Sequence, residues 1–131
     1  IRDRNSRKKI PMPKQLRVLM VEPHEAPYET LITDQLDDLQ ETVGGLFEMI
    51  GNGDGTLLVC NDEAKLIGME GNRRLDGDII AGPFFVVGEE GENLRSLTDA
   101  EMEKYKQRFA EIEDISPEEI QNNMGFEFYA W

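Results

Sequence analysis

The sequence contains one cysteine, Cys60, and one histidine, His24, among its 131 residues. A single cysteine cannot form an internal disulfide and fits a reducing cytoplasm, and one Cys with one His falls short of the zinc-finger ligand sets. No apolar run approaches the roughly 20 residues that a membrane-spanning helix needs, and no apolar segment follows the first basic residues as in a secretory signal. These absences predict a cytoplasmic protein without a membrane segment, a metal or a cofactor.

Positive charge is scarce outside the N-terminal segment. Seven of the fourteen Lys and Arg residues lie in residues 1–17 with one acidic residue, a net charge of +6, whereas residues 18–131 carry −19. We therefore divide the chain into a basic arm or linker, residues 1–15, and a single acidic domain, residues 16–131. An acidic body does not bind nucleic acid or anionic lipid by itself.

The basic arm is interrupted by Pro11 and Pro13, which disfavour both helix and strand. A disordered leader or linker is the simplest interpretation, and a contact with nucleic acid or an acidic partner through residues 1–17 is the alternative. The bases available for that contact are Arg2, Arg4, Arg7, Lys8 and Lys9. The first residue is Ile rather than Met, which indicates a trimmed product, the remainder of a tag-cleaved chain or a piece of a longer protein.

Hydrophobic patterning predicts an α+β domain in which two to three helices pack on one face of a mostly antiparallel or mixed sheet. The predicted strands are residues 16–22, 28–32, 46–50, 56–61, 65–69, 79–87 and 126–131, and residues 71–78 are predicted to form a loop. A helix is expected to begin at Thr33 or Asp34 and to end at Gly44. Two further helices are expected to begin at the Thr98 capping box and at Ser116-Pro117.

Residues 52–57, Asn-Gly-Asp-Gly-Thr-Leu, resemble the middle of a calcium-binding loop. The spacing places Ile50 and Asn61 at the two positions that need carboxylates, so a plain hairpin loop is favoured. Cys60 lies in an apolar run and is predicted to be a small buried side chain rather than a nucleophile. His24 is predicted to be an exposed loop residue.

Two further features indicate contacts rather than chemistry. Arg73 and Arg74 form the only cationic doublet of the acidic body, which we interpret as local charge neutralisation in a surface loop or as a binding contact. The aromatic tail, including Phe128 and Trp131, is interpreted as a docked strand. An exposed aromatic row would otherwise promote aggregation unless the core or a partner covered it.

Several segments together resemble the domain-of-unknown-function family numbered 3846. They are VLMVEP (18–23), PY (27–28), LQETVGG (39–45), VCNDEAKLIG (59–68), NRR (72–74), DIIAGPFFVVG (78–88) and SLTD (96–99). The resemblance covers about residues 16–109. It implies a small intracellular protein of bacterial phages and mobile elements, without an established reaction. It makes Asn61, Asn72, Arg73 and Arg74 the first suspects for a surface contact, although both asparagines could equally form turns.

The leading functional hypothesis is a non-enzymatic acidic binding protein of a phage or mobile element, in which carboxylates imitate nucleic-acid phosphates. Its partner would be a host protein with a basic surface, such as a restriction or CRISPR nuclease. The candidate contact residues are Asp34, Asp37, Asp38, Glu41, Glu101, Glu103 and Glu111. The main alternative is an adaptor that binds through a sheet edge or the aromatic tail. Nucleic-acid contact through the arm, a small-molecule enzyme and a small homo-oligomer stay open.

Overall fold

The computed structural model describes residues 13–124 of the chain. The elements in chain order are β1 (Gln15–Val21), β2 (Tyr28–Thr33), α2 (Leu36–Val43), β3 (Phe47–Gly51), β4 (Thr56–Asn61), β5 (Gly71–Leu75), β6 (Asp78–Ala81), β7 (Phe84–Glu90), β8 (Asn93–Arg95), α3 (Asp99–Arg108) and α4 (Pro117–Met124).

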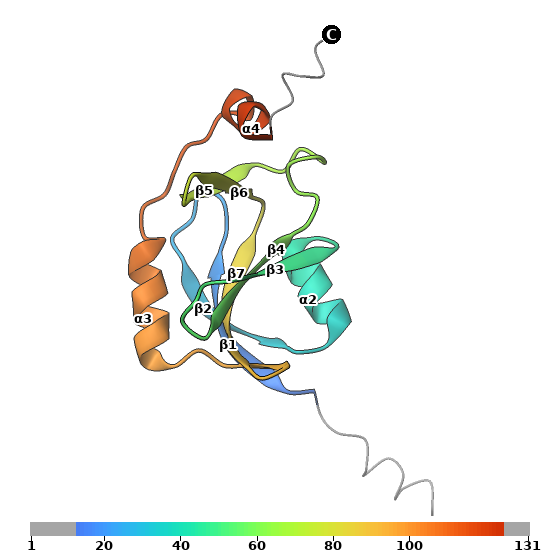
Figure 1. Cartoon of the computed structure of the whole chain (residues 1–131), viewed down its shortest axis with the longest axis vertical. Coiled ribbons are helices and arrows are strands. Elements are labelled where there is room, and N and C mark those ends of the chain that lie inside the picture. The colour runs from blue at the N-terminus through green and yellow to red at the C-terminus, as the bar shows by residue number, and fades with distance from the viewer. Residues whose placement is uncertain (1–12, 125–131) are drawn as a thin grey trace, which may run out of the picture.

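Six of the strands form one sheet, in which β2, β1, β7, β4 and β3 lie side by side in that order and β8 pairs with β7. Strands β5 and β6 form a separate two-stranded sheet beside the first (Figure 1). Every strand pairing is antiparallel. The predicted α+β class and the antiparallel sheet are therefore confirmed.

The central strand β7 has apolar side chains on both faces of the large sheet. Phe84 and Val86 pack in the cluster that contains α3, whereas Phe85 and Val87 pack in the cluster that contains α2. Successive side chains of a strand point to opposite faces, so a continuous apolar run needs cover on both sides. Helices α2 and α3 supply that cover from opposite sides (Figure 1). This corrects the expectation that the helices share one face.

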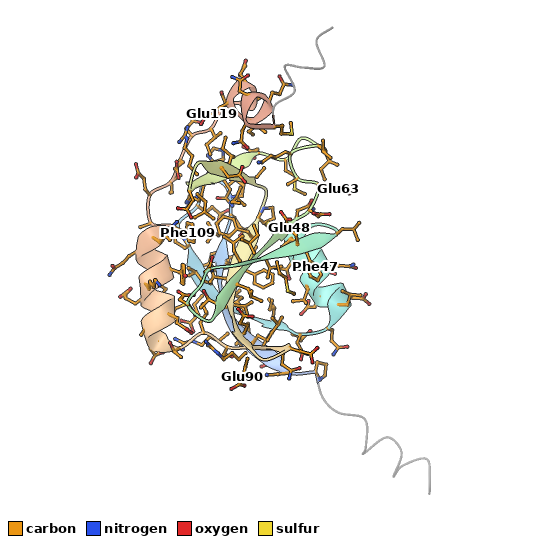
Figure 2. All side chains as sticks on the ribbon, viewed as in Figure 1. Phe47, Glu48, Glu63, Glu90, Phe109 and Glu119 are labelled. Carbon is orange, nitrogen blue, oxygen red and sulfur yellow. The ribbon has the colours of Figure 1, made fainter. Side chains whose placement is uncertain are left out.

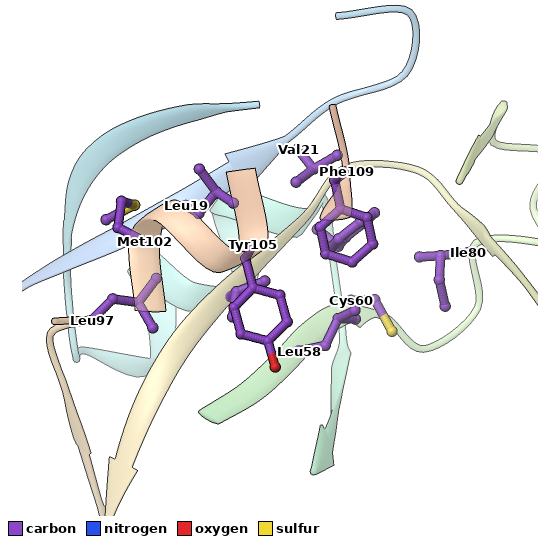
Figure 3. Close-up of a cluster of buried hydrophobic side chains, with 11 residues drawn as sticks. Leu19, Val21, Leu58, Cys60, Ile80, Leu97, Met102, Tyr105 and Phe109 are labelled. Carbon is purple, nitrogen blue, oxygen red and sulfur yellow. The ribbon is translucent and has the colours of Figure 1, made fainter. Parts of the chain in front are cut away.

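The α3 side of the core combines the helix with the segment that leads into it (Figure 3). Leu97 and Met102, which lie on either side of the helix start, are both 2% exposed. Tyr105 and Phe109 follow on the same helical face, and the ring of Phe109 meets that of Phe84 edge-on at 5.1 Å between centroids. The apolar face of α3 therefore packs on the sheet.

The segment between β4 and β7 differs most from the expectation. Residues 62–68 form turns where a strand is expected at 65–69, and residues 71–78 form most of a β-hairpin instead of a loop. Asp76 and Gly77, both with positive φ, make the two-residue connection between β5 and β6. This Asp-Gly pair is the standard sequence signal for such a hairpin turn.

The predicted strand 79–87 is two strands in two different sheets. Gly82, at φ 75°, and Pro83 separate β6 from β7, and the Gly82 amide donates to the carbonyl of Glu70 at 2.8 Å. A positive φ suits glycine, and proline cannot donate to a strand ladder, so the apolar run breaks there. The break allows the chain to pass from the small sheet into the large one.

Two predictions concern chain segments outside the described residues, namely the arm within residues 1–12 and the strand 126–131. Within residues 13–124, no helix combines the length and the apolar character required to cross a bilayer.

The start of α3 offers a direct test of the local signal. The Thr98 side chain accepts from the Glu101 amide at 3.1 Å, and the Glu101 carboxylate accepts from the Thr98 amide at 2.9 Å. We expect Thr98→Ala to lower the free energy of unfolding by about 1 kcal/mol, since a helix N-terminal amide loses its acceptor. Urea denaturation measures the loss. Gln107→Ala, an exposed change in the same helix, is the control, and equal effects of the two changes would contradict the prediction.

Candidate functional site

The longest stretch without Lys or Arg runs from residue 18 to residue 64 and holds eleven acidic residues. Helix α2 lies inside it and buries Leu39 and Val43 against the sheet. The other side of the helix faces outward. We define the acidic α2 surface as Asp34, Asp37, Asp38 and Glu41, of which Asp37 and Glu41 are exposed one helical turn apart.

The ion pairs formed by the basic residues that the structure describes lie elsewhere. These pairs are Arg17 with Glu29 and Asp99, Lys65 with Asp78, Arg74 with Glu113 and Glu119, Arg95 with Glu101, Lys104 with Asp54, and Arg108 with Asp76. Within residues 13–124, the acidic α2 surface therefore has no ion-pair partner. One of its carboxylates, that of Asp38, accepts from the Thr33 amide at 2.7 Å.

The acidic residues predicted on the other helix do not form an equivalent surface. Glu101 is occupied by Arg95 and by the capping contact with Thr98. Glu103 and Glu111 are exposed, but α3 itself also contains Lys104, Lys106 and Arg108. Since α2 and α3 cover opposite faces of the sheet, one flat partner surface cannot contact both.

Acidic side chains occur over much of the molecule. Figure 2 shows Glu90, on the β7–β8 hairpin, and Glu119, on α4, at opposite ends. Acidity alone therefore does not distinguish the α2 side. Its distinguishing feature is the absence of nearby basic residues in the sequence, a signal that a count of Lys and Arg along the chain reveals. The residues of the acidic α2 surface were predicted from their positions on the expected helix, without reference to the absence of nearby Lys and Arg.

Arg73 is not a surface residue, which corrects the prediction that it makes a binding contact. Its side chain is 1% exposed. The guanidinium donates to the carbonyls of Phe109 (3.1 Å), Glu25 (2.7 Å) and Asn72 (3.1 Å), and to Asn72 Oδ1 (2.7 Å). Burial lowers the pKa of Arg73, although the charge of Glu113 opposes the shift. The residue holds three chain segments together.

The buried side chain of Asn72 extends the same network. Its Nδ2 donates to the carbonyls of Val21 and Gly82, each at 2.9 Å, while its Oδ1 accepts from Arg73. Val21 ends β1 of the large sheet, and Asn72 lies in β5 of the small one. The network therefore fastens the small sheet to the large sheet. We refer to Asn72 and Arg73 with these acceptors as the Asn72–Arg73 network.

The other two residues suspected of surface contacts also have structural partners. Asn61 is buried, donates to the Val43 carbonyl at 3.1 Å and accepts from the Glu63 amide at 2.8 Å, so it acts as the turn former that was the open alternative. Arg74 is half exposed and bonds to the carboxylates of Glu113 and Glu119. Its charge is neutralised locally, as the first interpretation of the doublet proposed.

Cys60 and His24 line different hollows. Cys60 lines a hollow of about 200 Å³ with Glu48, and burial together with the Glu48 carboxylate raises the pKa of the thiol to about 12. The ring of His24 lies 2.8 Å from the Glu70 carboxylate in a second, larger hollow. A thiolate nucleophile needs a lowered pKa and a nearby base. This pair therefore does not have the arrangement of a catalytic dyad.

The second hollow, which contains His24 and Glu70, has a volume of about 630 Å³, about three times that of the hollow lined by Cys60. It lies between the turns of residues 62–68 and the segment that contains α4. We call it the α4 groove. Its apolar lining includes Leu66, Met69, Ile115, Ile120 and Met124.

The hairpin loop of residues 52–55 is fastened to α3 through Asp54. One carboxylate oxygen accepts from the Thr56 amide and hydroxyl, and the other accepts from Lys104 (2.6 Å) and from the Tyr105 hydroxyl (2.6 Å). Burial alone would raise the pKa of Asp54, but the bonds from Lys104, Thr56 and Tyr105 outweigh it and hold the pKa well below its usual value. Across the described part of the chain, no three His, Cys, Asp or Glu residues gather in a metal-binding arrangement.

Residues 16–110 match the family described as a domain of unknown function, DUF3846. The match spans well over half of the 131 residues, so the chain belongs to this family. It includes the acidic α2 surface and the Asn72–Arg73 network, whereas α4 lies beyond its end. No curated protein and no solved structure matches the chain.

The adjacent arginines provide a matched pair for testing the network. We expect Arg73→Met to lower the free energy of unfolding by about 3 kcal/mol, because buried carbonyl oxygens lose their donor. Arg74→Met should cost clearly less, since its ion pairs are partly exposed to solvent. Urea denaturation of both variants measures the difference. Equal losses of unfolding free energy in the two variants would contradict the structural role assigned to the buried Arg73.

Asp54 predicts a pH dependence of stability. Its folded pKa is lowered, so the stability it contributes is present above its unfolded pKa of about 4 and is lost as the pH falls below that value. Asp54→Asn should therefore be less stable than the parent chain near neutral pH, and the gap should narrow in acid. Unfolding curves recorded between neutral and acidic pH measure the gap. Asp62→Asn, at an exposed carboxylate, is the control, and a gap that stays constant with pH would refute the assignment.

Proposed function

We propose that this chain is a non-enzymatic acidic binding protein that uses the acidic α2 surface to contact a cationic surface of a partner protein. The observation that supports it is the uncompensated charge of this surface, since every ion pair that the described Lys and Arg residues form is with an acid outside it. Opposite charge raises the rate of association and makes it sensitive to salt. A carboxylate that already has an ion-pair partner contributes less to such a field.

The partner class that suits this surface is a protein that binds nucleic acid, because its Lys and Arg residues are arranged to meet a row of negative charges. On helix α2, Asp37 and Glu41 are separated by one turn, about 6 Å along the axis. A short acidic row of this kind can occupy part of a phosphate track, because it presents negative charges at regular intervals as a nucleic-acid strand does. Inhibition of a host defence nuclease of a restriction or CRISPR system would be the use of such a mimic in a phage or mobile element.

The last residues of the basic arm lie beside this surface, because the Asp34 amide donates to the Lys14 carbonyl at 3.1 Å. In the proposed function the arm is dispensable, and deletion of residues 1–12 should leave binding of the cationic partner intact. DNA binding that disappears with this deletion would instead support the arm as the functional segment.

A pair of double variants tests the position of the binding surface. Asp37→Asn with Glu41→Gln removes two charges from the acidic α2 surface, and Glu103→Gln with Glu111→Gln removes two exposed charges from the α3 side. We expect the first variant to weaken binding of a poly-arginine peptide about tenfold at low salt, and the second to change it little. Fluorescence anisotropy at low and high salt provides the measurement. Equal weakening by both variants would show that only net charge matters and would contradict the proposal.

The mimic proposal requires a further outcome with a DNA-binding nuclease. The parent chain should displace duplex DNA from the nuclease, and the α2 double variant should do so less well than the α3-side variant. Binding that is insensitive to salt would favour an adaptor instead. The two edge strands of the large sheet, β2 and β3, carry exposed Leu31 and Met49 and would be the adaptor's contact.

A further inference from the structure

Helix α4 is attached to the rest of the molecule by a small apolar cluster. Ile115 and Ile120 pack against Ile79 of the small sheet, and Met124 is partly buried against them. The two larger clusters each bury eight or more residues, so α4 is the most weakly supported helix of the described chain. Additional apolar side chains packed against α4 would therefore stabilise this helix.

The α4 groove lies along this cluster and is apolar without being covered. Leu66, on the opposite wall from α4, is 66% exposed, and the neighbouring Ile67 is 59% exposed. Leu66 is the most exposed of the large apolar side chains among the described residues. A contiguous apolar hollow of about 630 Å³ is typical of a surface that another chain segment or a ligand occupies.

The chain itself supplies a fitting occupant. Met124 lines the groove and is followed in the sequence by Gly125 and then by Phe-Glu-Phe-Tyr-Ala-Trp, residues 126–131. We propose that this aromatic tail, residues 125–131, turns back at Gly125 and occupies the α4 groove of its own chain. Glycine at this position is the usual residue for reversing direction after a helix. The proposal goes beyond the acidic binding function and does not depend on it.

Length and local concentration favour this occupant. Seven residues span up to about 24 Å, which is enough to follow the groove from its Met124 end. Aromatic side chains bury about 150–250 Å² each, so two of them suffice to cover an apolar hollow of this size. The covalent link also gives the tail a high effective concentration at the groove.

Charge argues against the other occupants. A second copy would bring together two chains of net charge −13, which repel each other. Nucleic acid would meet the carboxylates of Glu70 and Asp114, which line the groove together with a single lysine, Lys65. The aromatic tail has one charged side chain, Glu127. Electrostatic repulsion at the groove is therefore weaker for the tail than for a second copy or for nucleic acid.

The single tryptophan of the chain, Trp131, is a probe inside the proposed occupant. We expect its fluorescence in the full-length chain to be blue-shifted and protected from acrylamide. Leu66→Asp places a charge in the groove at an exposed position, and it should shift the emission towards that of a solvated indole and increase quenching severalfold. Leu31→Asp, a change at a 60% exposed leucine on β2, should leave the emission unchanged.

Three results would overturn the proposal: a solvated Trp131 in the parent chain, equal quenching in both leucine variants, or protection that grows with protein concentration. The last result would mean that the tail docks between copies. Phe128→Ala provides an independent variant that leaves the described fold untouched, and it should also increase quenching. Binding of poly-arginine by the acidic α2 surface should not change in Leu66→Asp, so failure of either proposal is recognised separately.

Discussion

The position of the small sheet depends on one buried charge. The guanidinium of Arg73 has no carboxylate partner within salt-bridge distance among the described residues and is balanced by carbonyl and amide oxygens. One of them, the Phe109 carbonyl, lies at the end of α3, where the helix dipole is negative. A buried charge is tolerated only when its donors are satisfied, so α3, β5 and the loop after β1 must occupy fixed relative positions. The hairpin β5–β6, which supports α4, is placed by this requirement.

On the surface, unlike at the buried Arg73, basic side chains are balanced by carboxylates. The described basic residues form ion pairs on the α3 and α4 sides and around the β7–β8 hairpin, which leaves the α2 side without compensation. Unpaired like charges repel each other and lower the stability of the folded state. Helix α2 nevertheless stays in place because Leu39 and Val43 are buried beneath it, and the Asn61 side chain bonds to the carbonyl at its end. The packing that holds α2 in place therefore does not depend on its exposed carboxylates. These carboxylates can be substituted, or can bind a partner, without unfolding the helix.

Local signals in the sequence were sufficient for several elements. The Thr98 capping box begins α3 as predicted, and the strand 56–61 has the predicted bounds. The partners of Arg73 could not be inferred, because Glu25 and Phe109 lie 48 and 36 residues away and nothing in an Arg-Arg doublet distinguishes a buried arginine from an exposed one. The hairpin at Asp76-Gly77 differs from the predicted loop although its residues are a standard signal for a two-residue turn. The acidic residues of α2 are predictable, and so is the lack of nearby Lys and Arg in the sequence, whereas the ion pairs that occupy acids elsewhere join residues far apart in the chain and depend on the fold.

The two adjacent arginines act in opposite directions, and this links the family domain to the segment beyond it. Arg73 bonds inward to residues that all lie within the matched region, 16–110. Arg74 points outward, and its two carboxylate partners, Glu113 and Glu119, lie after the end of that region. Alternation along β5 produces this division, since successive side chains face opposite ways. The domain can therefore keep its buried frame whether or not the added segment is docked, while Arg74 and the cluster around Ile115 decide how firmly α4 is held. The α4 groove lies at this junction, and cover of the groove by residues 125–131 would strengthen the attachment of α4.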